Sequence, residues 1–255
     1  MTGPADRPER SACPGPPEHP GPPECPAHPA HPECPANPGS PGPPGPTTVL
    51  VIAKEPVPGR VKTRLTPPYT PDEAAQLAEA ALYDTLQAVR AMPARRRVVV
   101  LDGRPGSWLP AGFEVRQQCD GGLDERLAAA FAGSAGPTLL IGMDTPQVTA
   151  QLLAPALDSG AWDDCDAWFG PAEDGGFWAL GLAAPDPRLL RGVPMSTART
   201  GAAQRARLTT AGLRVRDLPP LRDVDTAHDA ERVAAAAPAG RFAATLARLT
   251  PVTGR

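Results

Sequence analysis

The sequence predicts a single α/β domain, built as a Rossmann-like, mostly parallel sheet with helices on both faces. The first observation is the continuous apolar run at residues 49–53, which lacks the alternation of a half-exposed strand and is typical of a strand buried on both faces. The second is the alternation of strand-like and helix-like segments between Thr47 and Arg255. Together they predict one domain at residues 47–255, after an N-terminal tail.

The tail, residues 1–46, is expected to be disordered. It holds 17 of the 36 prolines of the chain and almost no large apolar side chain. Such a segment buries too little apolar surface to offset the entropy of ordering, and its composition favours polyproline II. Three interpretations remain open: a linker, an adaptor for a proline-binding partner, or a translation start placed too far upstream.

Potential zinc ligands also recur in the tail at every third residue, namely Cys25, His28, His31 and Cys34. In polyproline II, residues three apart stand roughly 9 Å apart along one face. Zinc needs ligand atoms at about 2.0–2.3 Å from one ion. Unless the tail folds back on itself, this row therefore cannot chelate zinc.

Capping residues and apolar spacing predict the elements after the first strand. Thr70 and Glu73 form a capping box with Pro71 at the first helical position, and apolar residues then recur at helical spacing. Later apolar runs predict strands, and a period of 3.6 residues predicts helices. The predicted segments are strands at 98–101, 113–115, 138–141 and 213–218, an aromatic hairpin at 168–178, and helices at 123–132, around 152–157, 199–208, 229–237 and 241–249.

A basic loop follows the first strand. Four cations lie within eleven residues there, and two prolines and a glycine restrict the backbone. Ligands of open parallel sheets bind beyond the carboxyl ends of the strands, where loop amides and cations hold phosphates. The loop is therefore predicted to bind phosphate, with a solvated basic turn as the alternative. The residues assigned to cofactor binding are Lys54, Pro56, Gly59, Lys62 and Arg64.

An aspartate lies just beyond another central strand. Asp144 follows the apolar segment 138–141, and parallel strands share a direction, so it should reach the same sheet edge as the basic loop. This position makes Asp144 the first candidate metal ligand. Alternatively, because Asp144 precedes Thr145 and Pro146, it could cap the helix that contains Leu152.

A second acidic candidate lies in the aromatic hairpin. The sequence Asp174-Gly175-Gly176 is a common hairpin turn signal. Gly170 and Gly181 beside it also permit a close approach of the backbone to a ligand. Asp174 is therefore either a turn residue or a site residue.

The composition argues against several classes of protein. There are 25 Lys and Arg against 28 Asp and Glu, and this balance does not indicate a nucleic-acid or membrane-surface binder. No apolar stretch is of spanning length, and the N-terminus lacks the regions of a signal peptide. Five cysteines, an odd number, fit a reducing compartment, so we expect a cytoplasmic protein.

Four motifs make the chain resemble a known family. They are AKEPVPGRVKTRL at residues 53–65, GMDTP at 142–146, GPAEDGG at 170–176 and DVDT at 223–226. In this order they resemble the bacterial domain-of-unknown-function 2064 (DUF2064) family of glycosyltransferase-like proteins, which has been associated with arsenosugar biosynthesis. The resemblance implies the GT-A fold of nucleotide-diphospho-sugar transferases.

The motifs are also similar to those of nucleotidyltransferases with this fold, such as the molybdenum-cofactor and phospholactate guanylyltransferases and the cytidylyltransferase of Kdo activation. This similarity implies that Lys54, Lys62 and Arg64 hold the phosphates of the nucleotide. It also implies that Asp144 binds Mg²⁺ or Mn²⁺ and that Asp225 supplies a second ligand.

Two positions depart from the family pattern. Where the family usually has Leu-Gly-Glu-Arg, this chain has Leu-Asp-Glu-Arg at residues 123–126, so Asp124 replaces the glycine. Arg126 is counted with the cofactor-binding residues, so the acidic replacement is expected near the nucleotide. Where the family favours Trp before Ser-Thr, this chain has Met195, and acceptor recognition is expected to differ.

Three functions fit this set of residues. The leading hypothesis is glycosyl transfer from a nucleotide sugar to a small-molecule acceptor, with Asp144, Asp174 and Lys62 as catalytic residues and Asp174 as the candidate base. The alternative is nucleotidyl transfer, in which an acceptor phosphate attacks a nucleoside triphosphate and pyrophosphate leaves. A non-catalytic nucleotide-binding adaptor is the third hypothesis, and two candidate metal ligands argue against it.

Overall fold

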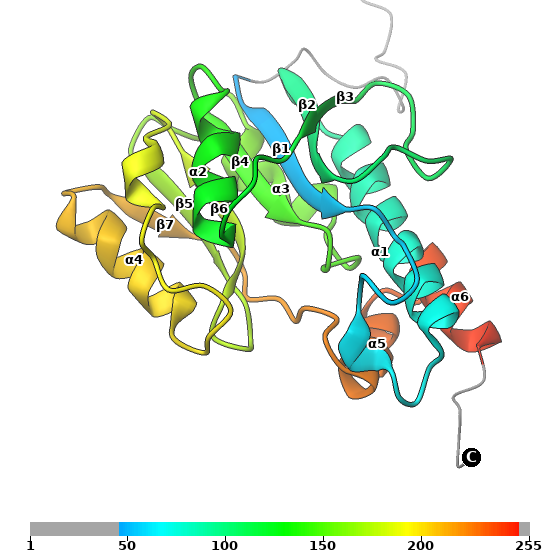
Figure 1. Cartoon of the computed structure of the whole chain (residues 1–255). Helices are drawn as coiled ribbons and strands as arrows, with labels where there is room; N and C mark the ends of the chain where they lie inside the picture. Colours follow the sequence, from blue (N-terminus) through cyan, green and yellow to red (C-terminus); the bar gives the residue numbers. More distant parts are fainter. Residues whose placement is uncertain (1–45, 250–255) are drawn as a thin grey trace, which may run out of the picture. The chain divides into compact units, whose positions relative to one another are not determined.

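A seven-stranded sheet lies at the centre of the computed structural model, which describes residues 46–249 (Figure 1). The strand order is β3-β2-β1-β4-β6-β5-β7, and six of the seven strands run in one direction while β6 runs in the other. The mostly parallel sheet predicted from the sequence is thus confirmed. The strands are β1 (Thr48–Lys54), β2 (Arg96–Asp102), β3 (Glu114–Gln117), β4 (Thr138–Gly142), β5 (Ala167–Pro171), β6 (Phe177–Leu182) and β7 (Val215–Asp217).

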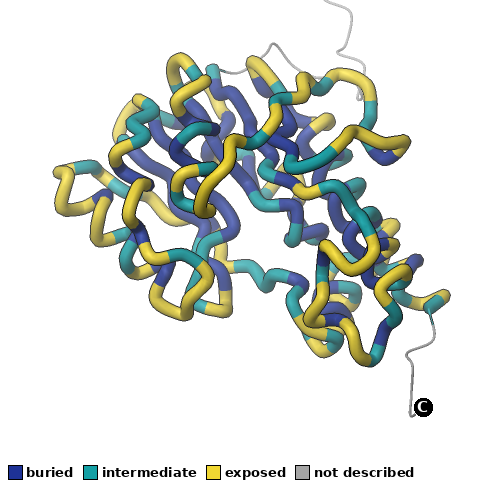
Figure 2. Tube along the Cα trace, viewed as in Figure 1, coloured by how far each residue is buried: buried dark blue, intermediate teal, exposed yellow. Residues whose placement is uncertain are grey.

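Helices cover both faces of this sheet (Figures 1 and 2). α1 (Pro71–Arg90) and α3 (Ala150–Leu157) pack on one face, and α2 (Leu123–Ala132) and α4 (Thr200–Thr210) pack on the other. α5 (Ala227–Ala236) and α6 (Arg241–Arg248) pack against the side of α1 that faces away from the sheet. Two short 3-10 turns complete the set, η1 (Thr63–Leu65) and η2 (Pro187–Leu189).

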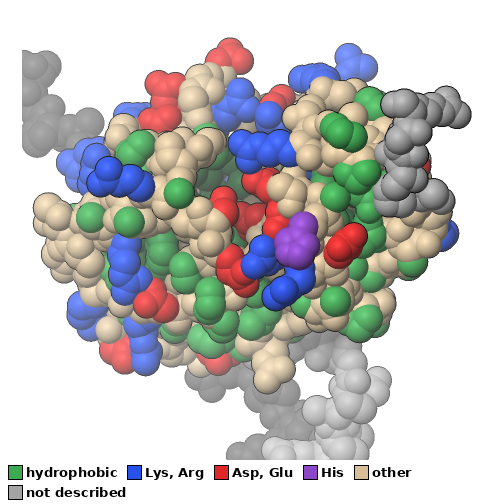
Figure 3. Space-filling model, turned by 90° about the horizontal axis from the view of Figure 1, so that it is seen from below, with side chains coloured by type: hydrophobic (Ala, Val, Ile, Leu, Met, Phe, Trp, Pro, Cys, Tyr) green, Lys and Arg blue, Asp and Glu red, His purple; other side chains and the backbone are tan. Residues whose placement is uncertain are grey.

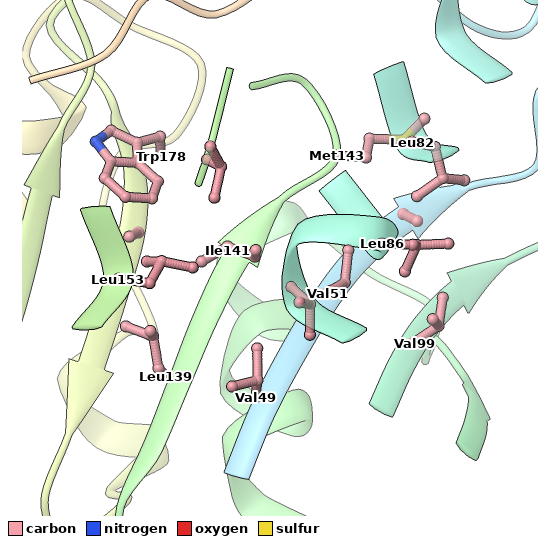
Figure 4. Close-up of a cluster of buried hydrophobic side chains, with 14 of the residues drawn as sticks. Val49, Val51, Leu82, Leu86, Val99, Leu139, Ile141, Met143, Leu153 and Trp178 are labelled. Carbon is pink, nitrogen blue, oxygen red and sulfur yellow. The ribbon is translucent and has the colours of Figure 1, made fainter. Parts of the chain in front are cut away.

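β1 is buried on both faces, which explains its continuous apolar run. Val49 and Val51 pack with Leu82 and Leu86 of α1 (Figure 4), whereas Leu50 packs with the residues under α2. Side chains alternate between the two faces of a strand, so a strand covered on both sides needs apolar residues at every position. β1 therefore has no polar face.

The reversed strand β6 brings the β5–β6 turn to the carboxyl edge of the sheet. Because β6 is antiparallel to both β4 and β5, β5 ends at the same edge as β1 and β4. A short turn at residues 172–176 then connects the two strands. A crossover to a parallel strand would need a dozen or more residues. The reversal thus places Asp174 at the same edge as Lys54.

The predicted elements all form, with small shifts of their ends. α2 has the predicted bounds, β3 lies one to two residues later than predicted, and β7 is shorter but occupies the expected sheet edge. No helix in the described part of the chain is long and apolar enough to cross a bilayer. The predictions for the tail, including its zinc row and its proline-binding partner, concern residues 1–46, of which the structure describes only Pro46.

The capping box of α1 forms as predicted. The Thr70 hydroxyl accepts a hydrogen bond from the Glu73 amide at 3.2 Å, and the Glu73 carboxylate accepts one from the Thr70 amide at 2.8 Å. Thr70→Ala is expected to lower the free energy of unfolding by about 1 kcal/mol, because the Glu73 amide loses its acceptor and the Glu73 carboxylate loses its contact with the Thr70 hydroxyl. The control Gln76→Ala, at an exposed position of α1, should change it by less than about 0.5 kcal/mol in urea denaturation. Equal effects of the two variants would contradict the assignment.

Candidate active site

A cavity of about 690 Å³ opens at the carboxyl edge of the sheet. Its size lies within the range of about 300–1,000 Å³ that is usual for ligand pockets. Figure 3 views this edge and shows acidic and basic side chains gathered at the centre of the face. Most of the residues predicted for the site line the cavity, namely Lys54, Lys62, Arg64, Arg126, Asp144, Asp174 and Asp225.

Two residues predicted for cofactor binding lie outside the lining. Pro56 and Gly59 instead shape the turn between Lys54 and Lys62. Gly59 has a φ of +74°, a left-handed conformation that favours glycine. Pro56 and Gly59 therefore shape the loop that carries the cations and do not themselves line the cavity.

Lys62 joins the basic loop to two distant carboxylates. Its ammonium lies 2.8 Å from the Asp144 carboxylate and 3.7 Å from the Asp225 carboxylate. It also donates a hydrogen bond to the carbonyl of Val224. The Lys62 side chain is only 8% exposed, so its ammonium group is stabilised mainly by these partners and not by water. Arg64 adds a second cation, 2.9 Å from Asp225.

The backbone of Lys62 is held in a left-handed conformation, with a φ of +50°. A lysine adopts this region at a cost that the surrounding structure must offset. At the other end of the side chain, the ammonium contacts Asp144 and Asp225. The residue is therefore constrained both by the turn of its own loop and by residues from other elements.

The segment at residues 221–226 is tied to the rest of the site through its backbone. Leu221 pairs with Ala172 of the hairpin turn, and the Val224 amide donates to the carbonyl of Asp144 at 3.0 Å. The Arg222 guanidinium bridges Glu173 and Asp229, which links the hairpin turn to α5. These contacts place Asp225 beside Asp144, although β5, β6 and α4 separate them along the chain.

Asp144 does not cap α3. The N-cap is Thr149, whose hydroxyl accepts a hydrogen bond from the Leu152 amide at 3.2 Å. The alternative interpretation of Asp144 as a helix cap is therefore wrong, and its carboxylate is left to face Lys62.

Asp174 has a structural contact as well as a place in the lining. One of its carboxylate oxygens accepts a hydrogen bond from the Gly176 amide at 2.8 Å, as expected for a turn residue. The side chain also lines the cavity. The two interpretations of Asp174 are thus compatible.

Asp223 is a site residue for which the sequence analysis gave no role. It lines the cavity, and burial together with the nearby carboxylates of Asp144, Asp174 and Asp225 raises its pKa to about 7, against the opposing effect of Lys62. A signal was present in the sequence, because residues two apart in an extended segment share a side. Asp223 and Asp225 have that spacing.

The other end of the cavity contains a fixed polar network. Arg126 contacts Asp102 at 3.2 Å and the Gln118 side-chain oxygen at 3.4 Å. Asp124, expected near the nucleotide, instead accepts a hydrogen bond from the Gly192 amide at 2.8 Å and is not part of the lining. The departure from the family pattern at Asp124 therefore fixes a neighbouring loop and does not place a charge in the cavity.

The donor atoms suit a hard divalent cation. Asp144 and Asp225 offer carboxylate oxygens, which Mg²⁺ and Mn²⁺ accept, and Lys62 shows that a cation fits between them. Among residues 46–249, no three or more His, Cys, Asp or Glu side chains converge as a metal site. A bound ion would therefore take its remaining ligands from water and substrate oxygens.

Asp223→Asn is expected to raise the melting temperature of the metal-free protein at pH 8.5 and to raise it by a smaller amount at pH 5. The raised pKa means that the unfolded state loses this proton first, so ionisation of Asp223 lowers stability as the pH rises from about 4 to about 7. Asparagine removes that cost, which at pH 5 is only partly developed because the pH has passed the unfolded pKa but not the folded one. Thermal denaturation at both pH values is the measurement.

The matched control is Asp163→Asn, at an exposed aspartate before the amino end of β5, on the opposite edge of the sheet. It should have little effect at either pH. A melting temperature of Asp223→Asn below that of the wild type at pH 8.5 would contradict the prediction. It would show that Lys62 stabilises the ionised Asp223 more than burial destabilises it.

Comparison with solved structures confirms the predicted GT-A fold. A candidate nucleotide-diphospho-sugar transferase from Desulfovibrio desulfuricans G20 is 28% identical, with a TM-score of 0.64, and the match covers 71% of this chain and 83% of that one. The Rv0371C protein of Mycobacterium tuberculosis H37Rv, in complex with manganese, is 23% identical with a TM-score of 0.47 (74% and 98% covered). The 2-C-methyl-D-erythritol 4-phosphate cytidylyltransferase of Thermus thermophilus is 17% identical with a TM-score of 0.46 (75% and 98% covered).

A search of curated proteins found no match. A family described as "Uncharacterized protein conserved in bacteria (DUF2064)" matches residues 75–197. The matched residues include Arg126, Asp144 and Asp174, whereas the basic loop and residues 221–226 lie outside them. The resemblance predicted from the motifs is thus confirmed over the central part of the chain, which matches the DUF2064 family.

Proposed function

We propose that the protein is a metal-dependent transferase that uses a nucleotide-activated donor. The observation that carries the proposal is the convergence of cations and paired carboxylates on Lys62 within one cavity. Cations bind the phosphates of a donor, and carboxylates hold the metal ion that accompanies them. The similarity to a candidate nucleotide-diphospho-sugar transferase supports this assignment at the level of the fold.

Asp144 and Asp225 are the residues that would hold Mg²⁺ or Mn²⁺. When bound, the ion would neutralise charge on the phosphates of the donor. Lys62, which contacts both carboxylates, and Arg64, which contacts Asp225, would stabilise the phosphate leaving group. Lys54 and Arg126 also line the cavity and would bind the rest of the nucleotide.

The leading reaction is glycosyl transfer from a nucleotide sugar to a small-molecule acceptor. A nucleophilic atom of the acceptor attacks the sugar carbon, the bond to the diphosphate breaks, and the nucleoside diphosphate leaves with the electron pair. The proton of the acceptor passes to Asp174, whose carboxylate lines the cavity.

Nucleotidyl transfer is the second candidate, because the lining includes Lys54, Arg60, Lys62, Arg64 and Arg126. A triphosphate carries more negative charge than the diphosphate of a nucleotide sugar, so a dense set of cations suits it. In this reaction an acceptor phosphate attacks the α-phosphorus, and pyrophosphate leaves.

Asp144→Ala and Asp225→Ala are each expected to abolish the gain in nucleotide affinity that Mg²⁺ or Mn²⁺ produces. Nucleotide affinity is measured by calorimetry with and without metal, and the difference is the metal-dependent gain. Both measurements are needed because the loss of a carboxylate also removes its repulsion of the phosphates and so raises the metal-free affinity. Asp163→Ala is the control for loss of a surface carboxylate, and circular dichroism checks folding. A metal-dependent gain of wild-type size in both site variants would contradict the assignment.

A thermal-shift panel separates the two reactions. Nucleotide sugars, nucleoside diphosphates and nucleoside triphosphates are compared, each with Mg²⁺ or Mn²⁺, and glycosyl transfer predicts stabilisation by nucleotide sugars. Lys62→Met should reduce every shift, because it removes a buried phosphate-binding charge and keeps the length of the side chain. Stabilisation by triphosphates alone would favour nucleotidyl transfer and remove the leading reaction.

A further inference from the structure

The two lysines of the chain both line the cavity. Among its 25 Lys and Arg residues, only Lys54 and Lys62 are lysines, and the remaining cations are arginines. A lysine ammonium is a compact point charge with rotatable donors on a flexible stem, whereas an arginine guanidinium is a planar fork. Of the two lysines, only Lys62 forms ion pairs within residues 46–249, and it forms them with both candidate metal ligands.

The Lys62 ammonium is surrounded by oxygen atoms. It lies 2.8 Å from one oxygen of Asp144 and 3.7 Å from one of Asp225, and it donates a hydrogen bond to the Val224 carbonyl. Two carboxylates and a backbone carbonyl are also the kinds of ligand that Mg²⁺ and Mn²⁺ accept. The ammonium thus occupies a position that has the chemistry of a metal site.

Both oxygens of Asp225 face a cation in this arrangement. One faces Lys62, and the other accepts a hydrogen bond from the Arg64 guanidinium at 2.9 Å. An ion bound to the Asp144 oxygen would lie within about 5 Å of the Lys62 nitrogen, because Mg²⁺ lies about 2.0–2.1 Å from its ligands and that oxygen is 2.8 Å from the nitrogen. The ion and the ammonium would repel each other at this distance and compete for the same carboxylates.

Lys62, and not Arg64, occupies the position between the two carboxylates. Arg64 contacts Asp225 alone, and its side chain is 70% exposed. An ion shared by Asp144 and Asp225 would take the place of the group that already contacts both, which is the Lys62 ammonium. Because the lysine stem is flexible, the ammonium can move within the cavity, where the phosphates of a bound donor would be its new partners.

We propose that Lys62 and the divalent ion are alternative occupants of one position, so that binding of the ion displaces the ammonium toward the phosphates of the donor. This inference rests on the proposed function and adds a coupling between its two ligands. The free protein binds a divalent ion weakly, because the ammonium must leave its oxygen partners. A bound nucleotide lowers that cost, and by linkage the ion strengthens nucleotide binding by the same factor.

Lys62→Met tests the exchange, because methionine keeps a long unbranched side chain and removes the charge. The affinity of the nucleotide-free full chain for Mn²⁺ is measured by electron paramagnetic resonance of the unbound ion. The variant should bind Mn²⁺ at least about tenfold more tightly than the wild type, a difference of about 1.4 kcal/mol. An affinity equal to or below that of the wild type, in a variant whose circular dichroism is unchanged, would overturn the proposal.

Lys54→Met is the matched control, because it removes the same charge from the same cavity at an exposed lysine without an ion pair in the described part of the chain. Salt screens an exposed charge that makes no contact, so the Mn²⁺ affinity should rise by less than about twofold. Asp144→Ala measures Mn²⁺ bound elsewhere in the chain. Equal gains in Lys54→Met and Lys62→Met would indicate a general effect of charge and would overturn the exchange.

Displacement of the ammonium can be observed in the wild-type protein. Selective ¹³C labelling of lysine gives side-chain signals from Lys54 and Lys62 alone, and Lys54→Met assigns them. A neutral gadolinium chelate broadens the signals of exposed groups, so without metal it should affect the exposed Lys54 more than Lys62, whose side chain is 8% exposed. Saturating Mg²⁺ should raise the broadening of Lys62 toward that of Lys54. Unchanged broadening of Lys62 would overturn the displacement.

The calorimetry described above separates this inference from the proposed function. If metal produces no gain in nucleotide affinity in the wild type, the proposed function fails. If the gain is present and Asp144→Ala abolishes it, while Lys62→Met binds Mn²⁺ no more tightly than the wild type, the exchange fails and the metal-dependent transferase stands.

Discussion

The ion pairs of Lys62 are the constraint on which the rest of the site depends. A nearly buried ammonium is stable only with partners, and here the partners come from the end of β4 and from the segment before α5. The backbone of the same lysine is in a left-handed conformation. Loss of one carboxylate would therefore disturb the loop, the late segment and the charge balance together.

The order of the strands explains how these segments meet. β1 and β4 are neighbours and parallel, so the loops that follow them leave the sheet side by side. The reversed β6 returns the chain to β5 and places the hairpin turn at the same edge. The late segment then pairs with that turn through Leu221 and Ala172. Sheet topology thus brings together charges that are far apart in the sequence.

The fold could be predicted from local patterns of apolar and capping residues. Contacts between side chains that lie far apart in the sequence could not be predicted in this way. The unbroken apolar run of β1 and the capping box of α1 are local signals, and both elements formed as predicted. The choice between two roles for Asp144 depended on where α3 begins, which Thr149 decides. The direction of Asp124 toward Gly192 and the left-handed conformation of Lys62 depend on neighbours that local sequence does not specify.

The close contact between the hairpin turn and Gly201 has a consequence for divergence among related proteins. The Gly201 amide donates a hydrogen bond to the Gly175 carbonyl at 2.8 Å, and a Cβ at Gly201 would lie 2.4 Å from the Gly176 carbonyl oxygen. Because backbone atoms make this contact, the side chains at residues 194–200 can be exchanged without breaking it. The cations that line the cavity come from other elements, the end of β1 with the loop after it and α2. Related proteins could therefore change the surface of the cavity near Met195 through a few substitutions and keep these cations.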